Sequence, residues 1–232
     1  MMYNASFDDR NGTTRGERGL RRTGRATAAV LAFAATAHAQ MPSAPVLQNV
    51  WSVPGAVGAA NIAGGADGTA YAGAVSFSAS KLQFSGGLGY QSRTGMPART
   101  GYGIRAAMLF GGASSAFGFG AFAGVGGGNT SSTGADSLAS TTEVPLGVAV
   151  GWRRAFGGTH GVSLYADPAY VLYSGGAKSG GLFRVGLGAD FGITRSIGAT
   201  IGAELGATRP RGVGGPSGVL YGGGISYAFG RR

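Results

Sequence analysis

The sequence predicts an all-β fold, an antiparallel up-and-down transmembrane β-barrel of about ten strands, with eight strands as the alternative. Two observations predict it. Apolar side chains alternate with small or polar ones along most of the chain after residue 55, which is the period of a β-strand. Large aromatic side chains fall near the ends of these segments, and aliphatic or small ones fall in their middles. Aromatic girdles around an aliphatic band are typical of barrels that span a bilayer.

The start of the chain predicts a cleavable signal peptide. A basic stretch precedes an apolar run that ends in Ala37-His38-Ala39, which matches the A-x-A pattern of a cleavage site. Cleavage would fall between Ala39 and Gln40. The run is shorter than the ~20 residues of a spanning helix, and a short buried helix is the alternative. The predicted parts are the signal peptide 1–39, an extended Pro-rich lead 40–54 and a barrel domain 55–232.

Ten segments of the barrel domain alternate. In the clearest, TTEVPLGVAVGW, Val144, Leu146 and Val148 share one face, and Glu143 and Gly147 share the other. The predicted strands span residues 56–65, 69–79, 82–91, 101–111, 116–126, 142–154, 161–173, 182–192, 197–207 and 218–229. Short turns are expected near residues 80–81, 112–115, 155–160 and 193–196. Longer loops are expected at residues 92–100, 127–141, 174–181 and 208–217. Short turns on one side and long loops on the other are typical of transmembrane barrels.

Alternation alone does not decide which face lies inside, because a lipocalin-like soluble barrel alternates equally well with its apolar face inward. Here the less apolar face carries mainly Gly, Ala and Ser, whereas a water-facing surface is about 25–35% charged. Aromatic pairs such as Tyr102 and Phe110 span about 26 Å along a strand, which tilt reduces to about 20 Å. That is close to the apolar band of a membrane barrel. The apolar face is therefore predicted to meet lipid, and the small, polar face to line the lumen.

A set of charged side chains is predicted to point into the lumen and to form a salt-bridge network, because charges in a narrow barrel must pair or be hydrated. They are Lys81, Arg105, Glu143, Arg153, Asp167, Arg184, Asp190 and Glu204. Chance placement with ordinary hydration is the alternative. A three-residue loop at 193–195 predicts that Arg184 lies directly opposite Glu204 on the next strand.

A second set of charges falls in the longer loops. It consists of Arg93, Arg99, Lys178, Arg209, Arg211, Asp67 and Asp136. These residues predict either solvated loops or contacts with lipopolysaccharide phosphates through charge-assisted hydrogen bonds.

Composition argues against several functions. The net charge is +10, with six Arg against three acids in the leader. The remaining basic residues are scattered singly and no basic helix with interleaved aromatics appears, so nucleic acid is not an expected partner. The chain has no cysteine, which removes disulfides and thiolate metal sites. Its two histidines, His38 in the leader and His160 in a turn, form no ligand cluster and no nucleophile–base pair. We expect no enzyme activity, no metal and no cofactor.

The end of the chain matches the assembly signal of outer-membrane barrel proteins at Gly224, Tyr227 and Phe229. With the leader and the strand pattern, the mature chain resembles the small bacterial outer-membrane β-barrels of the opacity-protein and adhesin type. The resemblance implies a place in the outer membrane, contact with its lipid and lipopolysaccharide, and insertion by the barrel-assembly machinery. It implies a non-enzymatic structural or surface-interaction role. A narrow pore for ions or small solutes is the alternative, because inward glycines leave volume in a ten-stranded lumen.

Overall fold

The computed structural model describes eight stretches of the chain. They are residues 55–65, 68–93, 96–110, 115–130, 141–156, 160–175, 178–206 and 219–229. The predicted signal peptide 1–39, its cleavage residues Ala37, Ala39 and Gln40, and the lead 40–54 lie outside these stretches.

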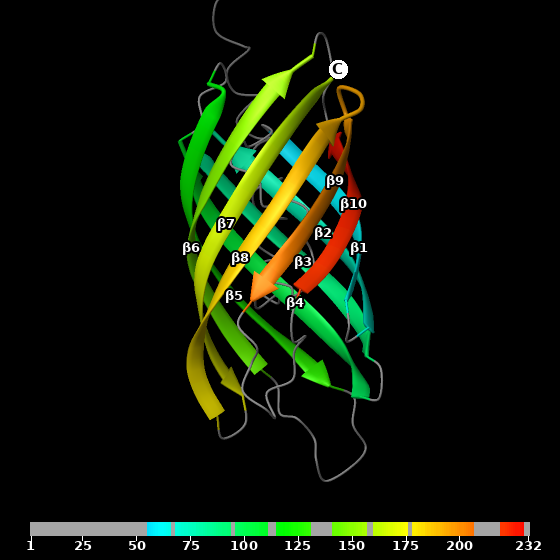
Figure 1. The fold of residues 1–232 in the computed structure, drawn as a ribbon, viewed down its shortest axis with the longest axis vertical. Helices are drawn as coiled ribbons and strands as arrows, with labels where there is room; N and C mark the ends of the chain where they lie inside the picture. Colours follow the sequence, from blue (N-terminus) through cyan, green and yellow to red (C-terminus); the bar gives the residue numbers. More distant parts are fainter. Residues whose placement is uncertain are drawn as a thin grey trace, which may run out of the picture. The chain divides into compact units, whose positions relative to one another are not determined.

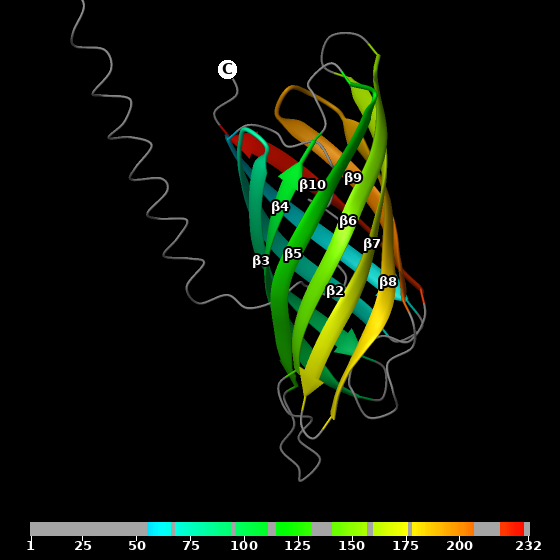
Figure 2. The same cartoon turned by 90° about the vertical axis from the view of Figure 1, so that its left-hand side faces the viewer.

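Within these stretches, ten antiparallel strands close into a barrel (Figure 1). Each strand pairs with its neighbours in sequence, and β1 pairs with β10 to complete the circle. The strands are β1 (Gly55–Gly65), β2 (Gly68–Ala79), β3 (Leu82–Arg93), β4 (Met96–Leu109), β5 (Phe117–Thr130), β6 (Thr141–Ala155), β7 (Gly161–Gly175), β8 (Lys178–Gly192), β9 (Ile197–Gly206) and β10 (Val219–Phe229). The predicted fold class is confirmed with ten strands, and the alternative of eight is wrong. Figure 2 shows the tilt of the strands across the barrel wall.

The two ends of the barrel differ in what they carry. Ala56 at the start of β1 pairs with Phe229 at the end of β10. The first strand therefore begins, and the last strand ends, at the same end of the barrel, here called the terminal end. The connections at the opposite, far end include residues 94–95 and 176–177. The long loops expected at 92–100 and 174–181 are therefore wrong, because β3, β4, β7 and β8 continue into them. Hydrophobic alternation stops where a strand leaves an apolar medium, but backbone pairing continues beyond that point.

The outer face of the barrel is apolar. Its exposed side chains include Val75, Leu88, Val148, Leu187 and Ile201 at mid-strand. Aromatic side chains pair across strands toward both ends, as in Tyr71 opposite Tyr90 and Phe77 opposite Phe84. An apolar belt bounded by aromatic rings fits hydrocarbon with an interface on either side. No helix in the described part of the chain is long and apolar enough to cross a membrane.

The interior is packed with side chains. One buried cluster lies on the inner faces of β4 to β8 and consists of Ala107, Leu109, Phe122, Ala149, Ala169, Val171, Tyr173 and Leu182. Glycines on neighbouring strands make room for the large members. A Cβ atom at Gly147 would collide with the Phe122 ring and come within 2.6 Å of the Pro168 carbonyl oxygen. The expectation that inward glycines leave open volume is therefore corrected at this position, because a neighbouring ring occupies the space.

Two prolines interrupt the hydrogen-bonded ladders in the middle of the wall. Pro145 lies in β6 where its pairing with β5 breaks between Leu146 and Glu143. Pro168 lies in β7 where its pairing with β6 breaks in the same way. Proline has no backbone N–H to donate, which explains both gaps.

Candidate functional site: the charged interior

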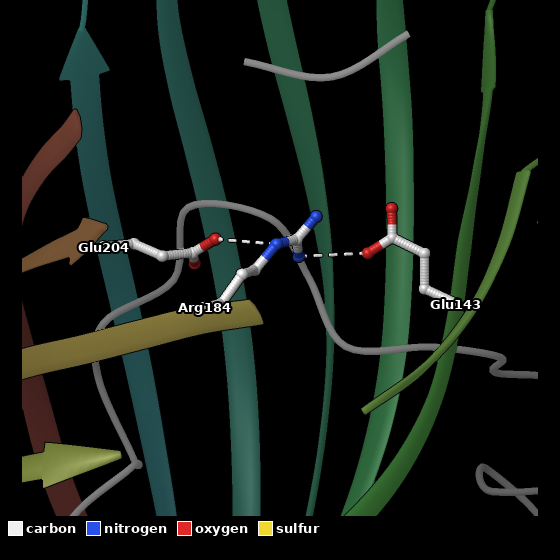
Figure 3. Close-up of polar contacts among 3 residues, drawn as sticks. All are labelled: Glu143, Arg184 and Glu204. Carbon is white, nitrogen blue, oxygen red and sulfur yellow. Dashed lines mark hydrogen bonds and ion pairs between the residues drawn. The ribbon is translucent and has the colours of Figure 1, made fainter. Parts of the chain in front are cut away.

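A charged triad crosses the inner wall from β6 to β9. Arg184 on β8 lies between two carboxylates, with its Nη1 atom donating to Glu143 Oε2 at 3.0 Å and its Nε atom 3.5 Å from Glu204 Oε1 (Figure 3). Glu143 is 1% exposed, and the Arg184 side chain is 10% exposed. Glu204 is more exposed to solvent, with 22% of its side chain exposed. Burial of Glu143 makes its contact with Arg184 the stronger of the two, because a hidden carboxylate cannot be hydrated instead.

The register between β8 and β9 corrects the predicted opposition of Arg184 and Glu204. Arg184 pairs with Gly206, and Glu204 pairs with Gly186, two positions away. The two charged residues are diagonal neighbours, and their long side chains still meet. The missing Cβ of Gly206 leaves room for the stem of Arg184, whose Cγ would lie 3.3 Å from a Cβ there.

The β8–β9 turn explains this shift. The predicted loop of three residues is wrong, because Gly192 pairs with Gly198 and five residues separate them. Thr194 Oγ1 accepts hydrogen bonds from the backbone N–H groups of Ser196 and Ile197 at 3.2 and 3.0 Å. The N–H groups of Ile193 and Thr194 both donate to the Ile197 carbonyl. A threonine hydroxyl that satisfies the backbone in this way favours the longer turn.

A second buried ion pair crosses the inner wall near the middle of the barrel, from β4 to β7. Arg105 Nη2 on β4 lies 3.7 Å from Asp167 Oδ2 on β7, and two strands separate these elements along the wall. Both side chains are buried. The Arg105 guanidinium also stacks over the Phe122 ring, with 3.9 Å between its Cζ atom and the ring centroid. This contact combines a cation–π attraction with an ion pair, so Arg105 ties three strands together.

Polar contacts continue toward the terminal end. The Thr200 hydroxyl on β9 donates to Asp190 on β8, directly across the strand pair. Arg153 on β6 donates from Nε to the Ser115 carbonyl at 3.1 Å, ahead of β5. Asp190 and Arg153 are both partly buried. Arg153 therefore holds Ser115, in the connection between β4 and β5, onto the wall.

Lys81 does not belong to the interior group. It lies in the two-residue turn between β2 and β3, is exposed, and has its Nζ atom 5.8 Å from the centroid of the outward-facing Phe110 ring. The turn begins at Ser80, which has a φ of 55°. Strand alternation does not extend into a turn, and the inward placement of Lys81 is therefore wrong.

The predicted assembly residues lie on the last strand. The rings of Tyr227 and Phe229 are both exposed and meet edge to face with centroids 5.0 Å apart. Phe229 also lies across the closing seam from Gly58 of β1, where a Cβ would come within 3.2 Å of its ring. Gly224 pairs with Asn61 of β1 and Thr200 of β9.

The loop charges expected to meet lipopolysaccharide remain predictions. Asp67, Asp136, Arg209 and Arg211 lie outside the described residues, as do the side chains of Arg93, Arg99 and Lys178.

The interior offers ion pairs rather than a reaction centre. Within the described ranges, no three residues of the metal-ligating types are grouped so that they could hold an ion. Several buried polar atoms have no hydrogen-bond partner there, including both amide atoms of Asn61 and both carboxylate oxygens of Asp167. Sequence analysis missed Asn61, the Phe122 stack and Thr200. The inward parity of each strand was the signal that could have found them.

Comparisons with known proteins show likenesses of fold. No family model matches the chain, and no curated protein matches it. Among solved structures, it is similar to the β-domain of the Bordetella autotransporter BrkA, with 14% identity, 75% of this chain and 98% of that chain covered, and a TM-score of 0.49. It is also similar to the N-terminal β-barrel domain of Pseudomonas aeruginosa OprF, with 12% identity, 76% of this chain and 98% of that chain covered, and a TM-score of 0.42. A third similar structure is a bacterial polysaccharide outer membrane secretin, with 7% identity, 70% of this chain and 57% of that chain covered, and a TM-score of 0.48. This chain therefore spans little more than half the length of the secretin.

These likenesses concern the barrel fold alone. None of the three structures is described as an opacity-type protein, so that resemblance stays a prediction.

Proposed function

We propose that this chain is a non-enzymatic outer-membrane β-barrel with a structural or surface-interaction role and an interior closed to steady ion flow. The observation that carries the proposal is the buried ion pair between Arg105 and Asp167, which reaches over two intervening strands inside the barrel. The exposed apolar belt supports contact with lipid, because an apolar surface of this kind facing water would lead the protein to aggregate.

Two layers of side chains support closure. The middle layer holds Arg105, Asp167 and Phe122, all buried. The layer nearer the far end holds Glu143 and Arg184, which are also buried. Small barrels whose interiors are filled by side chains carry no water column, whereas large porins do. The packed interior therefore favours a structural or surface role over transport.

A narrow pore is the second candidate, and one observation favours it. Asp190 and Glu204 keep part of their side chains exposed on the inner face of β8 and β9. A hydrated strip along these strands would carry cations past the two carboxylates if the ion pairs separated. Lipopolysaccharide at the far-end loops and the barrel-assembly machinery at the Phe229 strand remain partners of either version.

Planar-bilayer recording separates the two candidates. The folded wild-type protein should give no steady unitary current. A variant with Arg105→Ser and Asp167→Ser, which removes this buried pair without leaving one charge alone, should raise the conductance. Steady unitary currents from the wild type, unchanged in the variant, would favour the pore and refute closure. Protease protection of the same samples in vesicles serves as the control for insertion.

A further inference from the structure

Three exposed basic side chains surround the terminal end of the barrel. Lys81 lies in the β2–β3 turn, Arg154 lies near the end of β6, and Arg195 lies in the β8–β9 turn. We call these three residues the basic rim. Because they belong to separate hairpins around a ten-stranded circle, they cannot converge on one compact ligand. Their placement instead fits a partner that surrounds the barrel.

Two members of the basic rim adjoin exposed aromatic rings. Lys81 Nζ lies 5.8 Å from the Phe110 ring centroid, and Arg154 Cζ lies at the same distance from the Phe156 ring centroid. Both rings are largely exposed, at 41% and 58%. A cation held beside an outward ring lies where hydrocarbon meets head groups, because the ring favours the interface and the charge favours its polar side.

The turns at the terminal end carry no acidic side chain in the sequence. The turns at 80–81, 110–116, 156–160 and 193–196 contain neither Asp nor Glu. The acids of the barrel domain are elsewhere, at Asp67, Asp136, Glu143, Asp167, Asp190 and Glu204. Among the described residues, no carboxylate lies within ion-pair distance of the three rim groups. The described part of the protein therefore supplies these three groups with no counter-charge.

We propose that the basic rim binds the phosphates of anionic phospholipids in the leaflet at the terminal end. The inference rests on the proposed membrane function, since it requires the apolar belt to lie in a bilayer. It adds a lipid preference and assigns it to one end of the barrel. Basic groups beside an anionic membrane surface gain affinity from its negative potential, about fivefold for each Lys or Arg.

The test uses the full mature chain in vesicles of phosphatidylcholine alone and of phosphatidylcholine mixed equally with phosphatidylglycerol. Native mass spectrometry of the extracted protein counts retained lipids of each kind. The rim variant carries Lys81→Gln, Arg154→Gln and Arg195→Gln. A charge-matched control carries Ser92→Asp, Thr142→Asp and Ser179→Asp, which lower the net charge by the same amount at exposed positions near the far ends of β3, β6 and β8.

The wild type and the control should retain phosphatidylglycerol in preference to phosphatidylcholine. In the rim variant, the ratio of retained phosphatidylglycerol to retained phosphatidylcholine should fall about fivefold for each substitution. Equal loss in the control would show a net-charge effect and overturn the assignment to the rim. Displacement of the lipid by inorganic phosphate at equal concentration would indicate a free-anion site and overturn it too. If the wild type inserts but shows no lipid preference, the proposal that the rim binds anionic phospholipids is refuted and the membrane function stands. If the wild type fails to insert, the membrane function itself is refuted.

Discussion

Replacing Arg184 with methionine should destabilise the barrel far more than replacing Glu204. Methionine keeps most of the volume of the arginine stem but removes the charge between the two carboxylates. Glu143 is then left 1% exposed and without its 3.0 Å partner. Breaking a buried pair on one side costs about 3–5 kcal/mol, because the remaining charge loses that counter-ion and is still shielded from water.

The Glu204 contact should be worth much less. It is longer, at 3.5 Å, and the Glu204 side chain is 22% exposed, so water can replace the lost cation. Pairs that remain hydrated contribute about 0.2–1 kcal/mol. The two carboxylates of one triad should therefore differ severalfold in their coupling to Arg184.

Two double-mutant cycles measure this difference. One combines Arg184→Met with Glu143→Leu, and the other combines Arg184→Met with Glu204→Leu. Urea unfolding in detergent micelles, followed by tryptophan fluorescence and by far-ultraviolet circular dichroism, gives each free energy of unfolding. The Glu143 cycle should show a coupling of about 3 kcal/mol or more, with the double variant recovering most of the loss. A coupling to Glu204 that equals or exceeds the coupling to Glu143 would refute the reasoning from burial.

Three further outcomes are expected. Gly147→Ala should cost about 1–3 kcal/mol in unfolding free energy, because its methyl would overlap Phe122 and the Pro168 carbonyl; Gly73→Ala, which meets nothing within 4 Å, should change it little, and equal effects would contradict the packing. Phe229→Ala should reduce the membrane-inserted fraction in cells relative to Phe84→Ala, an equally outward ring; equal insertion would remove the assembly role. The mature protein should begin at Gln40 by mass spectrometry, and a chain in the membrane fraction that retains Met1 or Met2 would count against the cleavage site.

The faces of the strands could be predicted because strand geometry has a period of two. Once Val148 is outward, Glu143 must be inward, and the same parity places Arg105, Asp167 and Arg184 in the lumen. The ends of the strands could not be predicted as well. Alternation reports where the medium changes from apolar to polar, whereas β3 and β8 continue to pair beyond that boundary.

The pairing of the charges depended on information that the sequence does not carry locally. Glu143 and Arg184 lie on strands that are not adjacent, and their meeting depends on the stagger of the whole barrel. The register of β8 on β9 depended on how the Thr194 hydroxyl satisfies its turn. The predicted inward direction of both side chains was right, but the predicted length of the loop was wrong. Arg184 is therefore shifted by two positions along β9 relative to Glu204, and the two side chains still meet.

Gel mobility before and after boiling tests the central claim most directly, because a closed transmembrane barrel keeps its hydrogen-bonded wall in detergent until it is heated. The mature protein, folded into micelles or vesicles and loaded unboiled, should run at a different apparent mass from the boiled sample, and the unboiled form should resist protease. Identical mobility of the two samples, with complete digestion of the unboiled one, would contradict a transmembrane barrel.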